Sequence, residues 1–476
     1  MPLILPGNVA AATAGGFEVA NSCRFNAADS SKLTKTPASA GNQKRWTYSF
    51  WIKRCNPTVE DYVLYATDGG GTNKTHVTFV AGGGEFRIYN TVSGSTSNNL
   101  KTNRLFRDPS AWYHIVVVWD TANGTTADRI QLWVNGVRET SFSASTLNDE
   151  NSTINDDVEH TISGTPTYID GYMAEVCFID GTVYTASDFG EFDEDSPSIW
   201  KPKDVSGLTF GTNGFYLDFE DSSNLGIDAN GGTDLTEANL AATDSSIDTP
   251  TNNFPTINVL NNMASAQMVI TEGNLHKHNQ PNSNYHRSVY GTMGASSGKW
   301  YYEMKITNIN SGDTGNTFIG IIDADQMDNH LTASAHYKFV NQSRGYGYFG
   351  QSGNKFNNGS DSSFGDTWRA ADDIVGCAFD LDNLKIYFSK DGTWQNSGDP
   401  ESCATGTGSA YDLASGYTYL PAIGVHYGDD QFDLNFGSPI NTISSGNADA
   451  NDYGNFEYAV PSGYYALCTK NLAEFG

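Results

Sequence analysis

Apolar and polar residues alternate with a period of two along most of this chain. The pattern is clearest at 368–394, WRAADDIVGCAFDLDNLKIYFSKDGTW, where it covers 375–381 and again 384–388. The pair Asp382-Asn383 separates the two runs, and a second turn follows at 390–392. Alternation broken by Asn, Asp and Gly turns is typical of β-hairpins. The stretch therefore predicts a hairpin that ends in a second tight turn.

The same pattern predicts many strands, and we find no amphipathic helix of four turns. The expected strands lie at 23–26, 46–54, 111–120, 130–137, 213–221, 298–307, 318–324, 419–427, 430–437 and 463–468. Two more strands are expected within 167–183, and a hairpin at 345–359. The strand at 46–54 places Trp46, Tyr48, Phe50 and Ile52 on one face, and the strand at 111–120 is apolar on both faces. The predicted fold class is all-β, with two antiparallel, jelly-roll-like β-sandwiches in series.

Length and composition divide the chain into domains. Its 476 residues exceed the ~250–300 residues at which one hydrophobic core stops growing. Residues 222–257 are rich in Asp, Asn, Ser, Thr and Gly, which is typical of a connecting segment. The expected order is an extended anchoring arm (1–16), a first sandwich (17–221), a polar linker (222–257) and a second sandwich (258–476). The strand at 213–221 is expected to pair back with the first strand.

The charge balance of the chain indicates which classes of partner to expect. Asp and Glu total 55 against 27 Lys and Arg, so the net charge is −28 and the surface is expected to be acidic. Nucleic acid is not expected as a partner, because phosphate contacts need basic patches. No apolar run reaches the ~18 residues of a membrane span.

Among the 6 cysteines, Cys177 and Cys377 lie in apolar strands, as buried free thiols do.

Two stretches of motifs resemble known domain families. The first ~220 residues resemble a laminin-G/concanavalin A-like lectin domain, in RWTYSFWIKR, AWYHIVVVWD, IQLWVNGV and YIDGYMAEVCFIDG. The second half resembles a SPRY domain, in SGKWYYEMKIT, FIGIID, GYGYFG, ADDIVGCAFDLDNLKIYFSKDG and YLPAIGV. The resemblance implies a concanavalin A-like sandwich followed by a SPRY-like one.

The combination also resembles tail-fibre-like and other virion proteins of bacteriophages, especially marine ones. The opening ILPGNVAAATAGGFEVANSCRFNAADSSKLTKTPASAGNQKRWTYSFWIKR, the stretch IWKPKDVSGLTFGTNGFYLDFEDSSNLGIDANG and the ending PSGYYALCTKNL carry this likeness. It implies a structural or adhesive component of a virion, with other virion proteins and a host-surface glycan or receptor as partners. A homo-oligomer within the particle is expected. No basic residue precedes the apolar N-terminus, which is a poor secretory signal, so we expect synthesis in the bacterial host cytoplasm.

Aromatic residues are the candidate binding groups, because sugar rings and partner proteins both contact exposed aromatic rings. Trp51 and Trp133 lie opposite the more apolar faces of their strands. In the second half the candidates flank loops, where SPRY domains usually bind partners: Tyr346, Tyr348, Trp368 and Trp394. Packing in a core or against neighbouring subunits is the alternative for each.

No catalytic residues are expected. Glycan hydrolysis needs two carboxylates at a fixed separation, and the acidic run at 191–195 lacks the second Glu of the Glu-x-Asp-x-Glu pattern of concanavalin A-like glucanases. A histidine cluster at 276–278, with His286 nearby, is more simply a polar segment than a metal site.

Calcium is the one cofactor considered, because laminin-G-like domains often hold it in oxygen-rich loops. The weak candidate ligands are Asp120, Asn123 and Asp128. The loops at 148–150 and 155–157 offer similar oxygen atoms.

The leading hypothesis is a non-catalytic virion structural protein, a tail-fibre-like or capsid-attached appendage, that attaches the particle to host-surface glycans or receptors. The alternatives are a purely architectural head-decoration or cement protein and a glycan hydrolase of concanavalin A-like fold. Deletion of residues 1–16 is expected to abolish incorporation into the particle while both domains stay folded.

Overall fold

The computed structural model describes residues 16–164, 166–261, 268–279, 286–309, 317–327, 338–426 and 430–476. They form two compact units, the first ending at Thr251 and the second running from Asn252 to Gly476. The N-terminal arm expected at 1–16 lies, apart from Gly16, outside the described residues.

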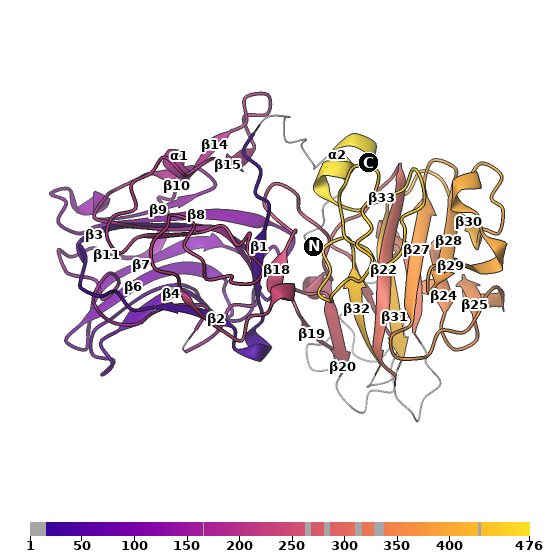
Figure 1. The fold of residues 1–476 in the computed structure, drawn as a ribbon, viewed down its shortest axis with the longest axis horizontal. Coiled ribbons are helices and arrows are strands. Elements are labelled where there is room, and N and C mark those ends of the chain that lie inside the picture. The colour runs from indigo at the N-terminus through magenta and orange to yellow at the C-terminus, as the bar shows by residue number, and fades with distance from the viewer. Residues whose placement is uncertain are drawn as a thin grey trace. The chain divides into compact units, whose positions relative to one another are not determined.

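The first unit contains two large antiparallel sheets, which Figure 1 shows as stacked layers at the indigo and magenta end of the chain. One sheet has the order β10 (Val137–Arg138), β9 (Ile130–Val134), β8 (Trp112–Asp120), β3 (Arg45–Arg54), β13 (Gly171–Asp180), β1 (Ser22–Phe25) and β18 (Ser245–Ser246), with β16 (Phe215–Leu217) also on β13. The other has the order β11 (Phe142–Thr146), β7 (Ser95–Leu105), β6 (Glu85–Val92), β5 (Lys74–Phe79), β4 (Asp61–Thr67), β12 (His160–Ile162), β2 (Lys32–Lys35) and β17 (Thr236–Ala238).

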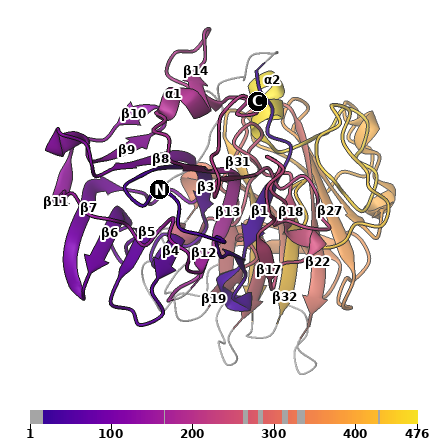
Figure 2. The same cartoon turned by 60° about the vertical axis from the view of Figure 1, so that its left-hand side comes forward.

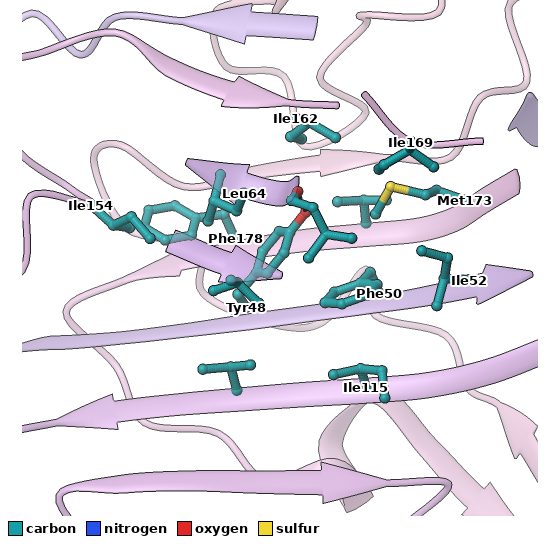
Figure 3. Close-up of a cluster of buried hydrophobic side chains, with 14 of the residues drawn as sticks. Tyr48, Phe50, Ile52, Leu64, Ile115, Ile154, Ile162, Ile169, Met173 and Phe178 are labelled. Atoms are coloured by element: carbon teal, nitrogen blue, oxygen red, sulfur yellow. Dashed lines mark hydrogen bonds between the residues drawn. The ribbon is translucent and has the colours of Figure 1, made fainter. Parts of the chain in front are cut away.

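The core of the first unit lies between these two sheets. Trp46, Tyr48, Phe50 and Ile52 all belong to it and are fully buried, so the predicted inner face of β3 is confirmed. Figure 3 shows Tyr48, Phe50 and Ile52 in a row along one strand. Each such side chain contributes about 1.5–3 kcal/mol on burial, so this inter-sheet layer stabilises the sandwich.

The outer face of the sheet that contains β8 is covered as well. Val116 and Val118 point away from the main core and pack with a second cluster that includes Phe189 and Phe210. Those residues come from the segment that carries α1 (Ala186–Phe189) and the β14 (Gly190–Phe192)–β15 (Trp200–Pro202) hairpin. This cover explains why 111–120 is apolar on both faces, as predicted.

The predicted linker at 222–257 is wrong over most of its length. Its residues up to Thr251 belong to the first unit, where β17 pairs with β2 and β18 pairs with β1. Leu225 and Leu235 are buried in the first core. Strand pairing satisfies part of the backbone of this polar segment, and its two buried leucines join it to the first core. The strand at 215–217 pairs with β13 and not with β1, which also differs from the prediction.

The second unit is also a two-sheet sandwich (Figure 1). One sheet has the order β19 (Met268–Thr271), β20 (His276–Asn279), β32 (Gln431–Asn435), β22 (Lys299–Asn308), β27 (Ile374–Asp380), β28 (Lys385–Lys390) and β29 (Thr393–Trp394), with β30 (Tyr411–Asp412) on β28 and β33 (Tyr465–Ala466) on β22. The other has the order β21 (His286–Tyr290), β31 (Tyr419–His426), β23 (Phe318–Asp323), β24 (Gly345–Phe349), β25 (Asn354–Asn357) and β26 (Ser360–Ser363). A helix, α2 (Thr469–Phe475), ends the chain.

The predicted hairpin at 368–394 is confirmed as β27, β28 and β29. Val375, Cys377 and Phe379 are buried in the second core. The final turn has φ of 47° at Asp391 and 75° at Gly392, as a two-residue turn with a left-handed backbone requires.

All 6 cysteines are buried and none forms a disulfide, which confirms the prediction for Cys177 and Cys377. Among the described residues, no helix is long and apolar enough to span a membrane.

Candidate functional site

A cluster of tyrosines around one histidine marks the outer face of β4, β5 and β6 in the first unit. These strands are neighbours in the sheet, as Figure 2 shows. Register places Tyr65 opposite His76 and His76 opposite Tyr89. Alternate residues on the same strands, such as Val77 and Ile88, fill the core. Because successive side chains on a strand point to opposite faces of the sheet, these aromatic residues point away from the core.

The rings are in mutual contact. The His76 ring lies 5.0 Å from the Tyr62 ring and 5.1 Å from the Tyr89 ring, centroid to centroid. Tyr65 packs edge-on against Tyr62 at 5.7 Å. Tyr65 and Tyr89 stay partly exposed, whereas His76 is only 5% exposed. We call Tyr62, Tyr65, His76 and Tyr89 the tyrosine platform.

Polar groups border the tyrosine platform. The Arg87 guanidinium lies 4.0 Å above the Tyr89 ring, and its Nε donates to Asn99 Oδ1 at 3.0 Å. Thr161 stands opposite Tyr65 on β12. The platform thus combines flat apolar rings with hydroxyl, amide and guanidinium groups, the mixture that a polyhydroxylated ring requires.

Two polar groups in this row have no hydrogen-bond partner within the protein. Both ring nitrogens of His76 are buried and unpartnered, and so is Thr161 Oγ1. Burial, aided by the charges of Arg87 and Lys74, lowers the pKa of His76 to about 3, so the ring is neutral near pH 7. A neutral imidazole carries one N–H donor and one acceptor nitrogen. Each unmet buried group costs about 1–3 kcal/mol.

Sequence reasoning missed this platform. The signal was present in the alternation of DYVLYAT, KTHVTF and EFRIYNTV, which puts Tyr65, His76 and Tyr89 on one face of each strand. Only the strand register brings the three residues into one row.

The predicted aromatic site residues are not gathered into one site. Trp51 is 4% exposed and stacks on His114 with ring centroids 4.8 Å apart. Tyr346, Tyr348 and Trp368 are buried in the second core. For these four residues the structure supports the alternative of packing in a core, because each faces a packed layer.

Trp133 and Trp394 keep part of their surface accessible. Trp133 packs against the cluster on the outer face of β8. Trp394 meets Tyr301 edge-on at 6.4 Å. Their role in binding stays a prediction.

The weak calcium candidates are occupied by other contacts. Asp120 pairs with Arg45 at 3.1 Å and also accepts from the Asn123 amide at 3.2 Å. Asp128 pairs with Arg138 at 2.6 Å. In the part of the chain that the structure describes, no group of three or more His, Cys, Asp and Glu side chains is placed to hold a metal ion.

The acidic run at 191–195 is held by a lysine. Lys201 Nζ lies 3.3 Å from the Asp193 carboxylate and 3.6 Å from that of Glu191. Asp193 is buried and also accepts backbone N–H groups of Asp195 and Ser196, at 3.0 and 2.9 Å. These contacts fix a hairpin turn.

A cavity of about 310 Å³ lies on the outer face of β22, β27 and β32 in the second unit. Two buried carboxylates line it. Glu303 accepts backbone N–H groups of Glu457 and Tyr458 at 3.0 and 2.9 Å, and Asp433 binds His276 Nδ1 at 2.5 Å and the Asn441 amide at 2.8 Å. Both carboxylates therefore already have donors, and Glu303 holds the segment that covers this sheet.

Comparison with known proteins agrees with the two sandwiches. Residues 26–186 match the family model of the concanavalin A-like lectin/glucanases superfamily, and residues 299–439 match the SPRY domain model. No curated protein sequence matches the chain. Similar solved structures include the SPRY domain of human HERC1, at 16% identity over 35% of this chain and 91% of that chain with a TM-score of 0.27. Domains LG4-5 of the mouse laminin alpha1 chain match at 9% identity over 90% of this chain and 91% of that chain, with a TM-score of 0.30. The two family models show a concanavalin A-like domain followed by a SPRY domain.

Proposed function

We propose that this chain is a non-catalytic structural protein of a bacteriophage virion, tail-fibre-like or capsid-attached, which binds host-surface glycans through the tyrosine platform. The observation that carries glycan binding is the row of partly exposed tyrosines around a histidine whose nitrogens have no partner. The likeness of the opening and closing stretches to phage virion proteins supports the location in a particle. The two domains found are of classes that suggest binding.

Stacking on tyrosine would provide part of the affinity. A pyranose face that covers about 60 Å² of ring surface contributes about 1.5 kcal/mol, at about 25 cal/mol per Å². Arg87 and Asn99 lie beside the Tyr89 ring and offer polar contacts to sugar hydroxyls. Because rings cover the His76 nitrogens, a tyrosine must change rotamer before a hydroxyl reaches them.

The engagement of Glu191 and Asp193 with Lys201 supports binding without hydrolysis. A carboxylate that acts as acid or nucleophile must face the glycosidic bond. Release of reducing sugar from host polysaccharide by the full chain would contradict the non-catalytic proposal.

The first experiment is a binding measurement with the full chain on a glycan array and on host-surface polysaccharide. Tyr89→Ala is expected to weaken binding about tenfold, the equivalent of about 1.5 kcal/mol. Tyr417→Ala is the matched control, because Arg344 lies 4.0 Å above that partly exposed ring in the SPRY domain. Equal binding by Tyr89→Ala and the unmodified chain, or no binding to any glycan, would overturn the proposed site.

His76→Phe separates binding from folding. Replacing the imidazole by a ring without nitrogen removes two unmet buried polar atoms, so the free protein is expected to gain about 1–3 kcal/mol of stability. The same change removes hydrogen bonds to the ligand, so glycan affinity is expected to fall. A loss of both stability and affinity would indicate a packing role for His76.

Location in a particle needs its own test. Mass spectrometry of gradient-purified phage particles that encode this chain is expected to find it at stoichiometric levels. Its absence from the particles would refute the virion part of the proposal and leave glycan binding to stand on the array result.

A further inference from the structure

Two basic side chains flank the tyrosine platform in the first unit. Lys74 lies two residues before His76 on β5, and Arg87 lies two residues before Tyr89 on β6. Alternate residues of a strand share one face of the sheet, so both basic residues belong to the face that carries the platform. Because β5 and β6 are antiparallel and pair His76 with Tyr89, the two basic residues stand on opposite sides of the row of rings.

Neither basic side chain is paired with an acid. Among the residues that the structure describes, no carboxylate forms an ion pair with Lys74 or Arg87. Lys101, which stands opposite Arg87 on β7, is by contrast paired with Glu85 at 3.2 Å. Lys74 and Arg87 are therefore available to a negatively charged ligand, although the whole chain has a net charge of −28.

The Arg87 guanidinium is held in place by its neighbours. Its central carbon lies 4.0 Å from the centre of the Tyr89 ring, and its Nε donates to Asn99 Oδ1 at 3.0 Å. Within the described part of the chain, neither Nη1 nor Nη2 donates a hydrogen bond. The two terminal nitrogens of a guanidinium suit an oxyanion such as a carboxylate, which accepts two parallel hydrogen bonds. A guanidinium that is already held loses less conformational freedom when it binds such a group.

Glu60, directly before β4, is an acid that acts against this positive charge. Burial, aided by the charge of Glu60, raises the pKa of Tyr62 to about 12. Burial also raises the pKa of Glu60 itself, against the effect of Arg87. In the middle of the platform the balance is positive, because the charges that lower the pKa of His76, after burial, are those of Arg87 and Lys74.

Building on the proposed glycan binding, we propose that the glycan recognised by the tyrosine platform is acidic and that Arg87 binds its carboxylate or sulfate group. The sugar ring stacks on the partly exposed tyrosines, and the anionic group accepts hydrogen bonds from Nη1 and Nη2 of Arg87. An extended acidic polymer that lies along β5 and β6 meets Arg87 on one side of the row of rings and Lys74 on the other. The sugar class thus follows from the charges at the border, and the stacking follows from the rings.

The first test compares charged and neutral glycans with the full chain. The array contains neutral, carboxylated and sulfated glycans, and binding is expected to be confined to the acidic ones. The acidic polymer that binds is then measured after chemical reduction of its carboxyl groups and, separately, after removal of its sulfate esters. One of these treatments is expected to weaken binding at least about tenfold, which identifies the group that Arg87 binds.

The outcomes separate this inference from the proposed function. Binding that is equally strong to neutral and to acidic glycans would overturn the acidic class and leave glycan binding intact. Absence of binding to every glycan on the array would overturn both.

Variants of the basic residues assign the effect to the platform. Arg87→Gln is expected to weaken binding of the acidic polymer at least about tenfold, and Lys74→Gln about threefold, because lysine acts as a point charge without the two-pronged geometry. Arg369→Gln is the matched control, since it removes the same charge from an exposed arginine of the SPRY domain and should leave binding unchanged. Equal binding by Arg87→Gln and the unmodified chain would refute the role of Arg87.

Salt provides a readout that a purely structural role of Arg87 would not move. Raising the salt concentration from about 0.1 M to about 1 M shortens the Debye length from about 10 Å to about 3 Å. The affinity of the unmodified chain for the acidic polymer is expected to fall over this range, and that of Arg87→Gln is expected to fall less. Arg87→Lys keeps the charge, so its salt dependence should stay close to that of the unmodified chain, which covers the case that Arg87→Gln does not fold. An affinity that salt does not change would contradict the electrostatic recognition.

Discussion

Glu175 provides a sharp test of the electrostatics of the concanavalin A-like domain. It lies in β13 where the register shifts between Ala174 and Cys177, and its backbone has a φ of 50°. The side chain is 7% exposed, and Tyr216 donates its hydroxyl to Oε2 at 2.7 Å. A buried carboxyl group in a bulge, with one neutral donor, should resist ionisation.

Burial raises the pKa of Glu175 from 4.5 to about 8, against the opposing effect of the Tyr216 hydrogen bond. Asp218, Glu220 and Asp204 raise the pKa further. Between about pH 4.5 and pH 8 the folded chain keeps this proton and the unfolded chain releases it, so stability falls as pH rises. The contribution of the protonated Glu175 carboxyl to the free energy of unfolding is complete below about pH 4.5 and is lost as pH passes about 8. The difference of 8 − 4.5 = 3.5 pH units corresponds to about 5 kcal/mol at about 1.36 kcal/mol per unit.

Glu175→Gln preserves shape and the acceptor for Tyr216 but cannot ionise. The assay is calorimetric unfolding of the full chain from about pH 5 to about pH 9, with the transition of the first domain compared between variant and unmodified protein. As pH rises, the stability of the variant relative to the unmodified protein is expected to increase by up to about 1.4 kcal/mol per pH unit. The difference in stability is expected to level off above about pH 8. Tyr216→Phe removes the opposing hydrogen bond, so it should extend the decline to higher pH. A stability difference that does not change with pH would refute this account of Glu175.

Further predictions concern stability and are checked by denaturant unfolding of each variant. Asp61→Ala leaves its fully buried arginine partner unpaired and should cost about 3–5 kcal/mol, whereas Asp149→Ala breaks an exposed pair and should cost less than about 1 kcal/mol. Equal costs would contradict the burial argument. Gly136→Ala should destabilise more than Gly181→Ala, because both have φ near +80° (77° and 81°) but only the first would place a methyl group 2.3 Å from an indole ring. A shorter chain that ends before β17 should lose stability in the first domain, and an unchanged transition would restore the linker interpretation.

The elements that sequence predicted well are those whose signal is local. The Asn135-Gly136 turn takes φ of 46° and 77°, which few other residue pairs adopt, so the hairpin of β9 and β10 follows from two residues. The alternation of Trp46, Tyr48, Phe50 and Ile52 likewise fixes which face of β3 enters the core. No partner strand needs to be known for either inference.

The candidate site could not be predicted in this way. Trp51 stands opposite the inner face of its strand, as an exposed residue would, but a hairpin more than a hundred residues later covers it, and Trp200 joins its packing cluster. The tyrosine platform is formed by residues of three strands. Each strand contributes one or two rings, and no distinctive spacing marks these rings in the sequence. The segment at 222–251 looked like a linker because its few apolar residues gave no periodicity.

The sequence alone determined the all-β class, the inner faces of the long strands, the tight turns and the division into two sandwiches, because hydrophobic period and turn chemistry act between near neighbours in the chain. The tertiary structure alone decided which outer faces are covered, which polar groups lack partners, and that His76 meets three tyrosines. Those outcomes depend on strand register and on segments distant in sequence, and the pattern of any single strand carries no information about either.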